Sequence, residues 1–562
     1  MTKTTSQMLK EVIKLGLIAG LISLSLSVIG MVELFSKREL IAGIISLGQV
    51  FLFAPPIALG FMAAQKVAKE KKNLPLIFGA ITGFFAAIPL IILIILESNF
   101  DLRQFLPNVS PALVDILTFS LDPIIGSLVL LVVTTVLGLA AAGMYLLPKH
   151  IQKPLANGII YTLVIGLFSE NLSERLRSFF GVGFVKILFD GKALNVVTAI
   201  ILFILIVVLT VWWTRQGESV KARFTPKSAQ EQKRNRRITL GAGVVFLLFL
   251  PLLLGTYLSE VTNNVLIYVL MGFGLNIVVG FAGLLDLGYV AFFAFGAYTM
   301  AILTSTSDLG VAGISFWLAL PICVLVAVTA GVILGVPVLR MRGDYLAIVT
   351  LGFGEIIRIL ALSDLLKPYI GGAQGILQIN KPIIFGIDLI KPDQFYYVVL
   401  TGVLIAAFVS WRLSESRLGR QWMALREDED VAEAMGINLV ATKLLAFGIG
   451  AGFSGLSGAI FASKLTSIFP HSFNLLVSIN VLCLIIVGGM GSLPGVVVGA
   501  LILVGLPELL REFAEYRMLM YGALLIVMML SKPEGFWPSP VRKRELLAFK
   551  EQNDPTVVQE EG

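Results

Sequence analysis

The sequence predicts an all-α fold, a polytopic bundle of about 14–16 membrane-crossing helices with short or broken helices in its C-terminal part. Three observations predict it. Of the 562 residues, 57% are hydrophobic and only 14% are charged, whereas soluble domains carry about 25% charged residues. The mean hydropathy is +0.90. Apolar runs of the roughly 20 residues needed to cross a bilayer core recur along the whole chain, so lipid is the expected solvent.

The N-terminal part contains five apolar runs of spanning length and one shorter run. The first run is longer than the apolar core of a typical signal peptide and no cleavage motif follows it, so we expect a retained helix. Because Lys and Arg are enriched in cytoplasmic connections, Lys3, Lys10 and Lys14 place the N-terminus in the cytoplasm. That orientation requires the shorter run, 158–169, to cross as well. The five long runs are 15–34, 40–64, 74–96, 123–147 and 194–213.

A basic stretch separates this part from the rest of the chain. Residues 214–237 hold clustered Lys and Arg among Gln, Ser and Gly, which is typical of a solvated cytoplasmic connection. We therefore expect an N-terminal transmembrane extension of unknown role over 1–213, a basic cytoplasmic linker over 214–237 and a second transmembrane domain over 238–544. The polar tail 545–562 is expected to be disordered in the cytoplasm.

The second transmembrane part contains further apolar runs, several of them short or interrupted by glycine. Basic residues again mark the expected cytoplasmic ends, which places the C-terminus in the cytoplasm. The runs are 239–257, 261–283, 288–304, 314–338, 344–361, 396–412, 441–464, 474–489, 495–507 and 518–531.

The charge and the reactive side chains exclude several function classes. The formal net charge of +7 comes from short basic stretches between apolar runs, a pattern that membrane orientation explains and nucleic-acid binding does not. Cys323 and Cys483 each lie inside an apolar run, and His150 and His471 have no metal ligand at the usual spacing. We expect no disulfide, no metal site and no cofactor.

Three ordered strings of residues carry a resemblance to a known family. They are Gly274 to Gly288, continuing as Ala291 to Tyr298, then Leu339 to Ile356, and Ile485 to Gly495. They resemble the permeases of branched-chain amino acid ABC importers, in particular the LivM-like branch. The resemblance covers about residues 239–540, which makes 238–544 a LivM-like permease domain, whereas residues 1–238 lie outside it.

Polar residues within these strings are candidates for a substrate pathway. Glycines let helices approach closely or break, and Asn276 and Asp286 are costly in lipid unless they face protein or water. Both a pathway role and a structural tie at a helix end remain open for these two residues. Glu355 and Arg358, three residues apart, either form a local ion pair or serve the pathway. The candidate pathway residues are Asn276, Gly280, Gly283, Asp286, Tyr298, Thr350 and Glu355.

The glycine-rich string Gly448 to Ala459 contains G-x-G patterns, but it lies within a spanning run. A dinucleotide-binding loop needs a preceding strand, which is not expected there. Small residues at four-residue spacing, such as Gly448 and Gly452, instead favour close helix packing.

Residues 424–438 resemble the cytoplasmic coupling loop with which such permeases contact their ATPases. The acidic residues suit the positive end of a short helix, Ala432, Ala434 and Met435 offer a small apolar patch, and Gly436 is placed to end the helix. The candidate coupling residues are Arg426, Glu427, Asp428, Glu433, Ala434, Met435 and Gly436.

The sequence has no G-x-x-x-x-G-K-[ST] phosphate-binding loop, so the chain is not expected to be an enzyme and ATP hydrolysis is expected in separate subunits. The resemblance implies a permease subunit that translocates branched-chain or related small neutral amino acids. The partners it implies are a second permease subunit, two ABC ATPase subunits and an external substrate-binding protein. The implied location is a bacterial or archaeal cytoplasmic membrane, with both termini in the cytoplasm.

Three alternatives remain open. A permease of the same family could carry urea or short amides. An ion-coupled secondary transporter would also use broken helices and intramembrane carboxylates such as Asp286 and Glu355. A non-transport scaffold or sensor would be favoured only if residues 1–238 dominate the function.

Overall fold

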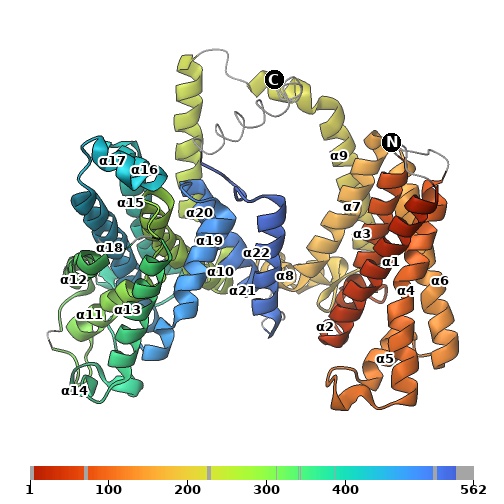
Figure 1. The fold of residues 1–562 in the computed structure, drawn as a ribbon, viewed down its shortest axis with the longest axis horizontal. Coiled ribbons are helices and arrows are strands. Elements are labelled where there is room, and N and C mark those ends of the chain that lie inside the picture. Colours follow the sequence, from red (N-terminus) through yellow and green to blue (C-terminus); the bar gives the residue numbers. More distant parts are fainter. Residues whose placement is uncertain are drawn as a thin grey trace. The chain divides into compact units, whose positions relative to one another are not determined.

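The structure is a computed structural model that describes residues 5–68, 74–224, 229–311, 313–338, 341, 343–384, 386–509 and 515–539 (Figure 1). The chain divides into two compact units, Met1–Arg236 and Arg237–Gly562. Both units consist mainly of helices, as the composition predicts. The tail 545–562 lies outside the described residues.

Four long helices form the core of the first unit. They are α1 Thr5–Val28, α3 Leu47–Ala68, α4 Pro75–Asn99 and α6 Pro123–Leu146. Helix α1 packs on α3 and α4, and both of these pack on α6. A Cβ added at Gly83 of α4 would lie 2.2 Å from the Thr134 carbonyl oxygen of α6. Small residues at such crossings let two helix backbones approach, which is a common packing mode in membranes.

A small sheet joins distant segments of the first unit. Its strands are β1 Glu39–Ile41, β2 Ile45–Ser46, β3 Phe189–Asp190 and β4 Ala193–Leu194, in the order β2-β1-β4-β3. Ile41 of β1 pairs in parallel with Leu194 of β4, and Arg38 Nη1 lies 3.2 Å from Glu170 Oε2 beside the sheet. The sequence does not predict these strands, since two or three residues are too few for an alternating pattern.

The short run 158–169, expected to cross although it is shorter than a full span, belongs mostly to a longer helix. Helix α7 spans Lys149–Leu167 and α8 spans Ser169–Leu188, with a bend of 69° between them. Together they are apolar enough for one broken span. The remaining elements of the first unit are α2 Met31–Ser36, η1 Leu102–Gln104, α5 Pro111–Leu117 and α9 Val196–Phe224.

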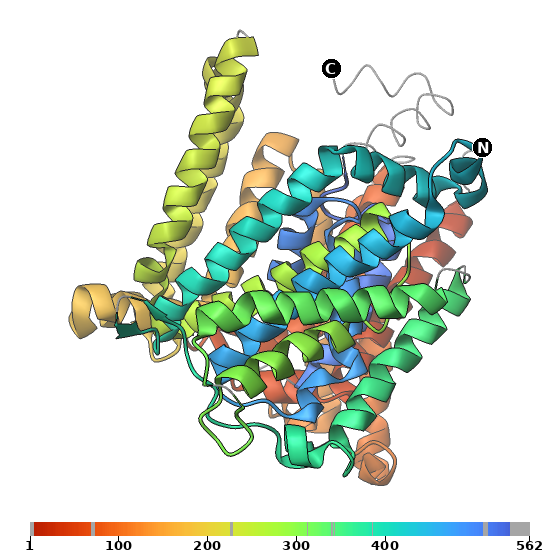
Figure 2. The same ribbon diagram turned by 90° about the vertical axis from the view of Figure 1, so that its left-hand side faces the viewer.

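Helix α18, Leu439–Leu465, is the central helix of the second unit. It packs on α11 Val290–Thr304 and on α12 Phe316–Val338. Figure 2 faces this unit and shows its helices crossing one another obliquely. A Cβ added at Gly296 of α11 would lie 2.0 Å from the Gly455 carbonyl oxygen of α18. The predicted packing role of the glycine-rich string is thereby confirmed.

The other elements of the second unit surround these three helices. The helices are α10 Ala229–Leu275, α13 Asp344–Leu362, α14 Lys367–Ile370, α15 Pro392–Glu415, α16 Arg417–Glu427, α17 Glu429–Ala434, α19 Leu475–Gly488, α20 Leu493–Ala500, α21 Leu506–Leu509 and α22 Arg517–Ser531. The shorter elements are the π-helices η2 Asn276–Phe281 and η5 Leu501–Gly505, the 3-10 helices η3 Gly372–Gln374 and η4 Pro470–Phe473, and the strands β5 Ile383–Ile384 and β6 Ile387–Asp388.

Helices α9 and α10 continue into the basic stretch 214–237, where the sequence analysis expected a linker. Residues 225–228 of that stretch lie outside the described residues. Ala, Lys, Arg, Gln and Glu are good helix formers, so polar residues extend a helix that hydrophobicity alone would end. The run 239–257 and most of the run 261–283 belong to α10, which has a non-helical residue at Gly255 (φ 72°); the second run ends in and just after η2.

Broken helices are present in the second unit, as expected. Helix α19 and the segment Leu493–Leu509 form a pair bent by 119°. By length and composition, the described residues contain 10 helices able to cross a membrane, or up to 12 if each bent pair is one span. This is fewer than the 14–16 expected, because α11 and α22 are shorter than a full span and several predicted runs merge into bent elements.

Candidate functional site

The break at the end of α10 brings the first and third family-like strings together. Asn276 opens the π-helix η2 and is fully buried. Its Oδ1 accepts a hydrogen bond of 2.8 Å from the backbone N–H of Gly491, which lies between α19 and α20. A π-helix and a glycine turn both leave backbone groups without helical partners. Asn276 therefore ties two helix breaks to each other.

Arg426 connects this junction to the predicted coupling loop. From the end of α16, its Nη1 donates a hydrogen bond of 2.7 Å to the Gly280 carbonyl oxygen in η2. Gly283, with φ of +72°, lies against the Arg426 side chain, whose Cγ would be 2.8 Å from a Cβ at this position. Arg426 is a candidate coupling residue and Gly280 a candidate pathway residue, and the structure brings the two into direct contact.

Asp286 lies in the non-helical segment between η2 and α11 and is fully buried. Its Oδ1 accepts a hydrogen bond of 2.9 Å from the Gly288 N–H. The neighbouring Leu287 N–H donates to Thr350 Oγ1 of α13 at 3.0 Å. A Cβ at Gly288 would lie 1.8 Å from the Thr350 carbonyl oxygen. Asp286 thus fixes the turn of this segment, and Thr350 holds the segment against α13.

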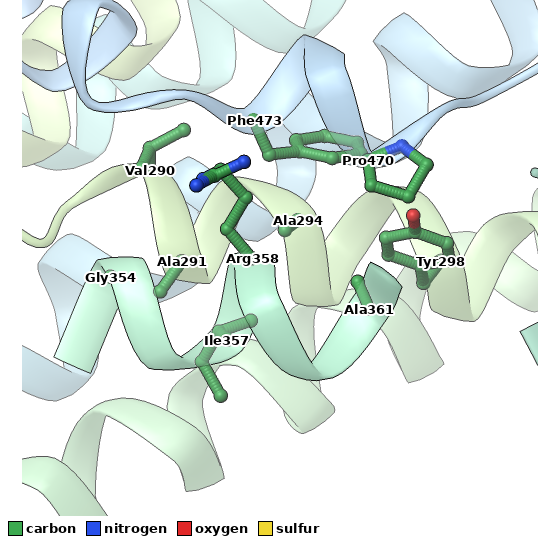
Figure 3. A pocket seen from close by; sticks show the side chains of 10 residues that line it. All are labelled: Val290, Ala291, Ala294, Tyr298, Gly354, Ile357, Arg358, Ala361, Pro470 and Phe473. Atoms are coloured by element: carbon green, nitrogen blue, oxygen red, sulfur yellow. The ribbon is translucent and has the colours of Figure 1, made fainter. Parts of the chain in front are cut away.

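Tyr298 lies farther along the same seam, at a cavity between α11, α13 and η4 (Figure 3). The cavity is small, about 10 Å³, which is room for about one water molecule. Tyr298 and Arg358 line it together with Phe473 of η4. Glu355 pairs with Arg358 through hydrogen bonds from Nε, at 2.8 Å, and from Nη2. The local ion pair considered from the sequence is therefore formed.

The predicted coupling loop folds as two short helices, α16 and α17. Trp422 on α16 is fully buried and its Nε1 donates to the Thr442 carbonyl oxygen of α18 at 2.9 Å, which anchors α16. Asp428 caps α17 by accepting from the N–H groups of Asp430 and Val431. This is the usual role of Asp at a helix N-terminus.

The end of α17 presents an exposed apolar surface. Val431 and Met435 are 58% and 79% exposed. Ala432, which the sequence analysis assigned to this patch, is buried and does not contribute. Gly436 ends the helix with φ of +84°, and its N–H donates to the Glu433 carbonyl oxygen. The glycine that was expected to end the helix does so in a left-handed conformation.

Several residues of this region were missed by the sequence analysis. The side chains of Gly491 and Phe473 have no titratable or hydrogen-bonding group that would single them out in the sequence. Their importance is seen only from the residues that they contact in the structure. Ser478 likewise accepts a hydrogen bond from the Val290 N–H at 2.9 Å. Within the described ranges, no group of three or more His, Cys, Asp or Glu side chains could hold a metal ion.

Broken helices and buried polar ties between them are typical of membrane transport proteins. The family model for the permease component of branched-chain amino acid transport systems matches residues 257–529. The LivM permease protein of the high-affinity branched-chain amino acid transport system of Escherichia coli K12 is 42% identical, over 54% of this chain and 75% of the relative.

More distant relatives include the LivH permease protein of Salmonella typhimurium, 24% identical over 50% of this chain and 96% of the relative. A probable LivM of Methanocaldococcus jannaschii is 23% identical over 41% of this chain and 72% of the relative. No solved structure gives a significant match.

The chain belongs to the family of branched-chain amino acid permeases of ABC transport systems. It is a multi-pass protein of the cytoplasmic membrane, a transporter subunit and not an enzyme. Family membership also implies a transporter complex that contains a partner permease.

Proposed function

We propose that this chain and a second permease subunit form the pathway for branched-chain or related small neutral amino acids in an ABC importer. An external binding protein delivers the substrate, and two cytoplasmic ATPases dock on α16 and α17. The N- and C-termini are cytoplasmic in this proposal, and 214–237 is a cytoplasmic linker between an N-terminal extension and the permease domain.

The bond from Arg426 to Gly280 carries the proposal. It is a charge-assisted hydrogen bond, a class that contributes about 1.5–3 kcal/mol, between the candidate docking element and the π-helix. Asn276 extends the connection to the Gly491 turn. If an ATPase displaced α16, the hydrogen bonds of Arg426 and Asn276 would therefore transmit the movement directly to the two helix breaks.

In this proposal the candidate pathway residues are Asn276, Gly280, Gly283, Asp286, Tyr298, Thr350 and Glu355, and the coupling residues are Arg426, Glu427, Asp428, Glu433, Ala434, Met435 and Gly436. The exposed Val431 and Met435 side chains beside acidic residues suit an ATPase groove that is apolar with a basic rim. Such a surface has no evident use in a transporter driven by an ion gradient.

Substitution of Gly436 by Val tests the coupling role. A residue other than glycine in the left-handed region costs about 1–2 kcal/mol, so Val should distort the end of α17. No atom lies within 4 Å of a Cβ there, so the effect comes from the backbone and not from a clash. In the purified complex, we expect substrate-stimulated ATPase activity and uptake to fall together by about tenfold, the factor that 1.4 kcal/mol represents.

Gly43→Val is the matched control, because Gly43 also has a positive φ of 68° and no atom within 4 Å. It should leave coupling unchanged. Wild-type stimulation and uptake in Gly436→Val would show that α17 is not the coupling element. Uptake of leucine by vesicles that lack the ATPases would favour an ion-coupled transporter.

If urea or short amides competed for uptake more strongly than leucine does, the result would favour a permease for urea or short amides.

A further inference from the structure

A short segment that follows α22, residues 535–539, lies against the end of α19 and is named the strap. The Phe536 N–H donates to the Val487 carbonyl oxygen at 2.9 Å. The Trp537 N–H donates to the Gly488 carbonyl oxygen at 2.8 Å. Both carbonyl groups belong to the last turn of α19, where carbonyl oxygens have no partner within the helix. The strap therefore supplies hydrogen bonds that the end of this helix needs.

Two glycines let the strap approach the turn between α19 and α20. Gly489 and Gly535 have φ of +119° and +88°, in the region that favours glycine. A Cβ at Gly535 would lie 2.5 Å from Gly489 Cα, and a Cβ at Gly489 would lie 2.7 Å from the Trp537 carbonyl oxygen. Neither position can hold a larger residue unless the strap moves away from the turn.

The same turn also belongs to the junction with the candidate coupling loop. The Gly491 N–H donates to Asn276 Oδ1 of η2 at 2.8 Å, and Arg426 at the end of α16 bonds to η2. A Cβ at Gly491 would lie 3.7 Å from Arg426 Nη1 and 3.9 Å from Ser539 Cβ of the strap. The turn therefore lies between the coupling residue Arg426 and the strap.

We propose that the strap is a positioning element of the coupling path. When α16 moves, Asn276 pulls on Gly491, and a turn without further support would bend by itself. The strap bonds to both the turn and the last turn of α19, so the pull moves the end of α19 together with the turn. The broken pair of α19 and Leu493–Leu509 then follows the ATPases. This inference rests on the proposed function, in which the ATPases move α16.

Gly535→Ala tests the close contact between the strap and the turn. The added methyl group would lie 2.5 Å from backbone, so the strap should separate from Gly489. We expect the amount of leucine transported per ATP hydrolysed to fall by about fivefold, the factor that the loss of one backbone hydrogen bond represents. Gly386→Ala is the matched control, because Gly386 has a similar φ of +80° and no atom within 4 Å of a Cβ. It should keep the wild-type ratio.

Phe536→Pro tests the hydrogen bond to α19, because proline has no N–H to donate to the Val487 carbonyl oxygen. Phe536→Ala is the control, since it keeps the N–H and removes only a side chain that is 43% exposed. We expect the ratio of leucine to ATP to fall about fivefold in Phe536→Pro and to stay at the wild-type value in Phe536→Ala. The ratio is measured in assembled complexes, so a lower abundance of a variant does not alter it.

The outcomes distinguish this inference from the proposed function. A wild-type ratio in both Gly535→Ala and Phe536→Pro would overturn the coupling role of the strap, and a lower abundance at that ratio would mean that the strap only stabilises the fold. An equal loss in Phe536→Ala would overturn the backbone bond as the cause. A wild-type complex that moves no leucine in the presence of its binding protein and ATP would instead contradict the proposed function.

Discussion

In the first unit, most buried hydroxyl groups bond to the helix that carries them. Thr82 donates to the Phe78 carbonyl oxygen and Thr134 to the Leu130 carbonyl oxygen, each one turn earlier. Such bonds satisfy the side chain without joining one element to another. The exceptions are the hydroxyls of Ser23, Ser169 and Thr198, which donate to the carbonyl oxygens of Leu52, Lys192 and Ile187.

In the second unit, buried polar groups join segments far apart in sequence. Thr350 accepts from the Leu287 N–H, and the Tyr289 hydroxyl donates to the Gly450 carbonyl oxygen at 2.8 Å. Broken helices supply the free backbone groups that make such bonds available. The comparison teaches that polar bonds between distant segments gather at the broken helices of the second unit, the interruptions that a transport pathway needs, whereas the four core helices of the first unit run without a break.

The largest expected effect concerns packing, where the two units should behave alike. Gly83→Ala in the first unit and Gly296→Ala in the second each place a methyl group about 2 Å from a backbone oxygen, which cannot move aside as a side chain can. Overpacking of this kind costs about 3 kcal/mol. We expect both variants to lose most of their membrane abundance and several degrees of Tm, measured in detergent.

Gly143→Ala and Gly352→Ala are the controls, because a Cβ there lies 3.8 Å from Leu76 Cδ2 or has no neighbour within 4 Å. Both should match the wild type. A strong loss confined to Gly296→Ala would show that the units differ in packing as well as in polar bonding.

A pair of isosteric substitutions tests the polar comparison directly. Thr350→Val leaves the Leu287 N–H without its partner, and a buried unsatisfied donor costs about 1–3 kcal/mol. Thr134→Val removes a hydroxyl that bonds only to carbonyl oxygens of its own helix, and it should cost less than about 0.5 kcal/mol. We expect uptake and Tm to fall in Thr350→Val alone. Equal losses in both variants would remove the distinction between the units.

The smallest expected effect concerns two ion pairs. Lys443 Nζ lies 2.8 Å from Glu429 Oε2 with the Lys side chain 3% exposed, whereas Lys66 Nζ lies 3.0 Å from Glu11 Oε1 with 52% exposure. Lys443→Met should cost about 1 kcal/mol, since Glu429 keeps some contact with water, and Lys66→Met should cost about 0.3 kcal/mol. The stimulated ATPase activity and the Tm of both variants measure these effects. A larger loss of Tm in Lys66→Met than in Lys443→Met would contradict the expected order.

The sequence by itself determined the features that depend on neighbouring residues. Apolar runs predicted a helical membrane protein, the acidic residues predicted the start of a short helix near Asp428, and Gly436 was predicted to end that helix. These features follow from interactions within about one helical turn, so their pattern is visible along the chain. The family strings added the class of protein.

Only the tertiary structure decided which of these elements meet. Nothing in the sequence spacing indicated that Arg426 bonds to Gly280, that Asn276 accepts from Gly491, or that Arg358 shares a cavity with Tyr298 and Phe473. Such contacts join segments far apart in the chain, and their register depends on how whole helices bend and pack. The neighbours of a residue in the sequence determine whether it is helical. The residues that its side chain contacts depend on where helices cross, because close packing allows few alternative arrangements of the helices.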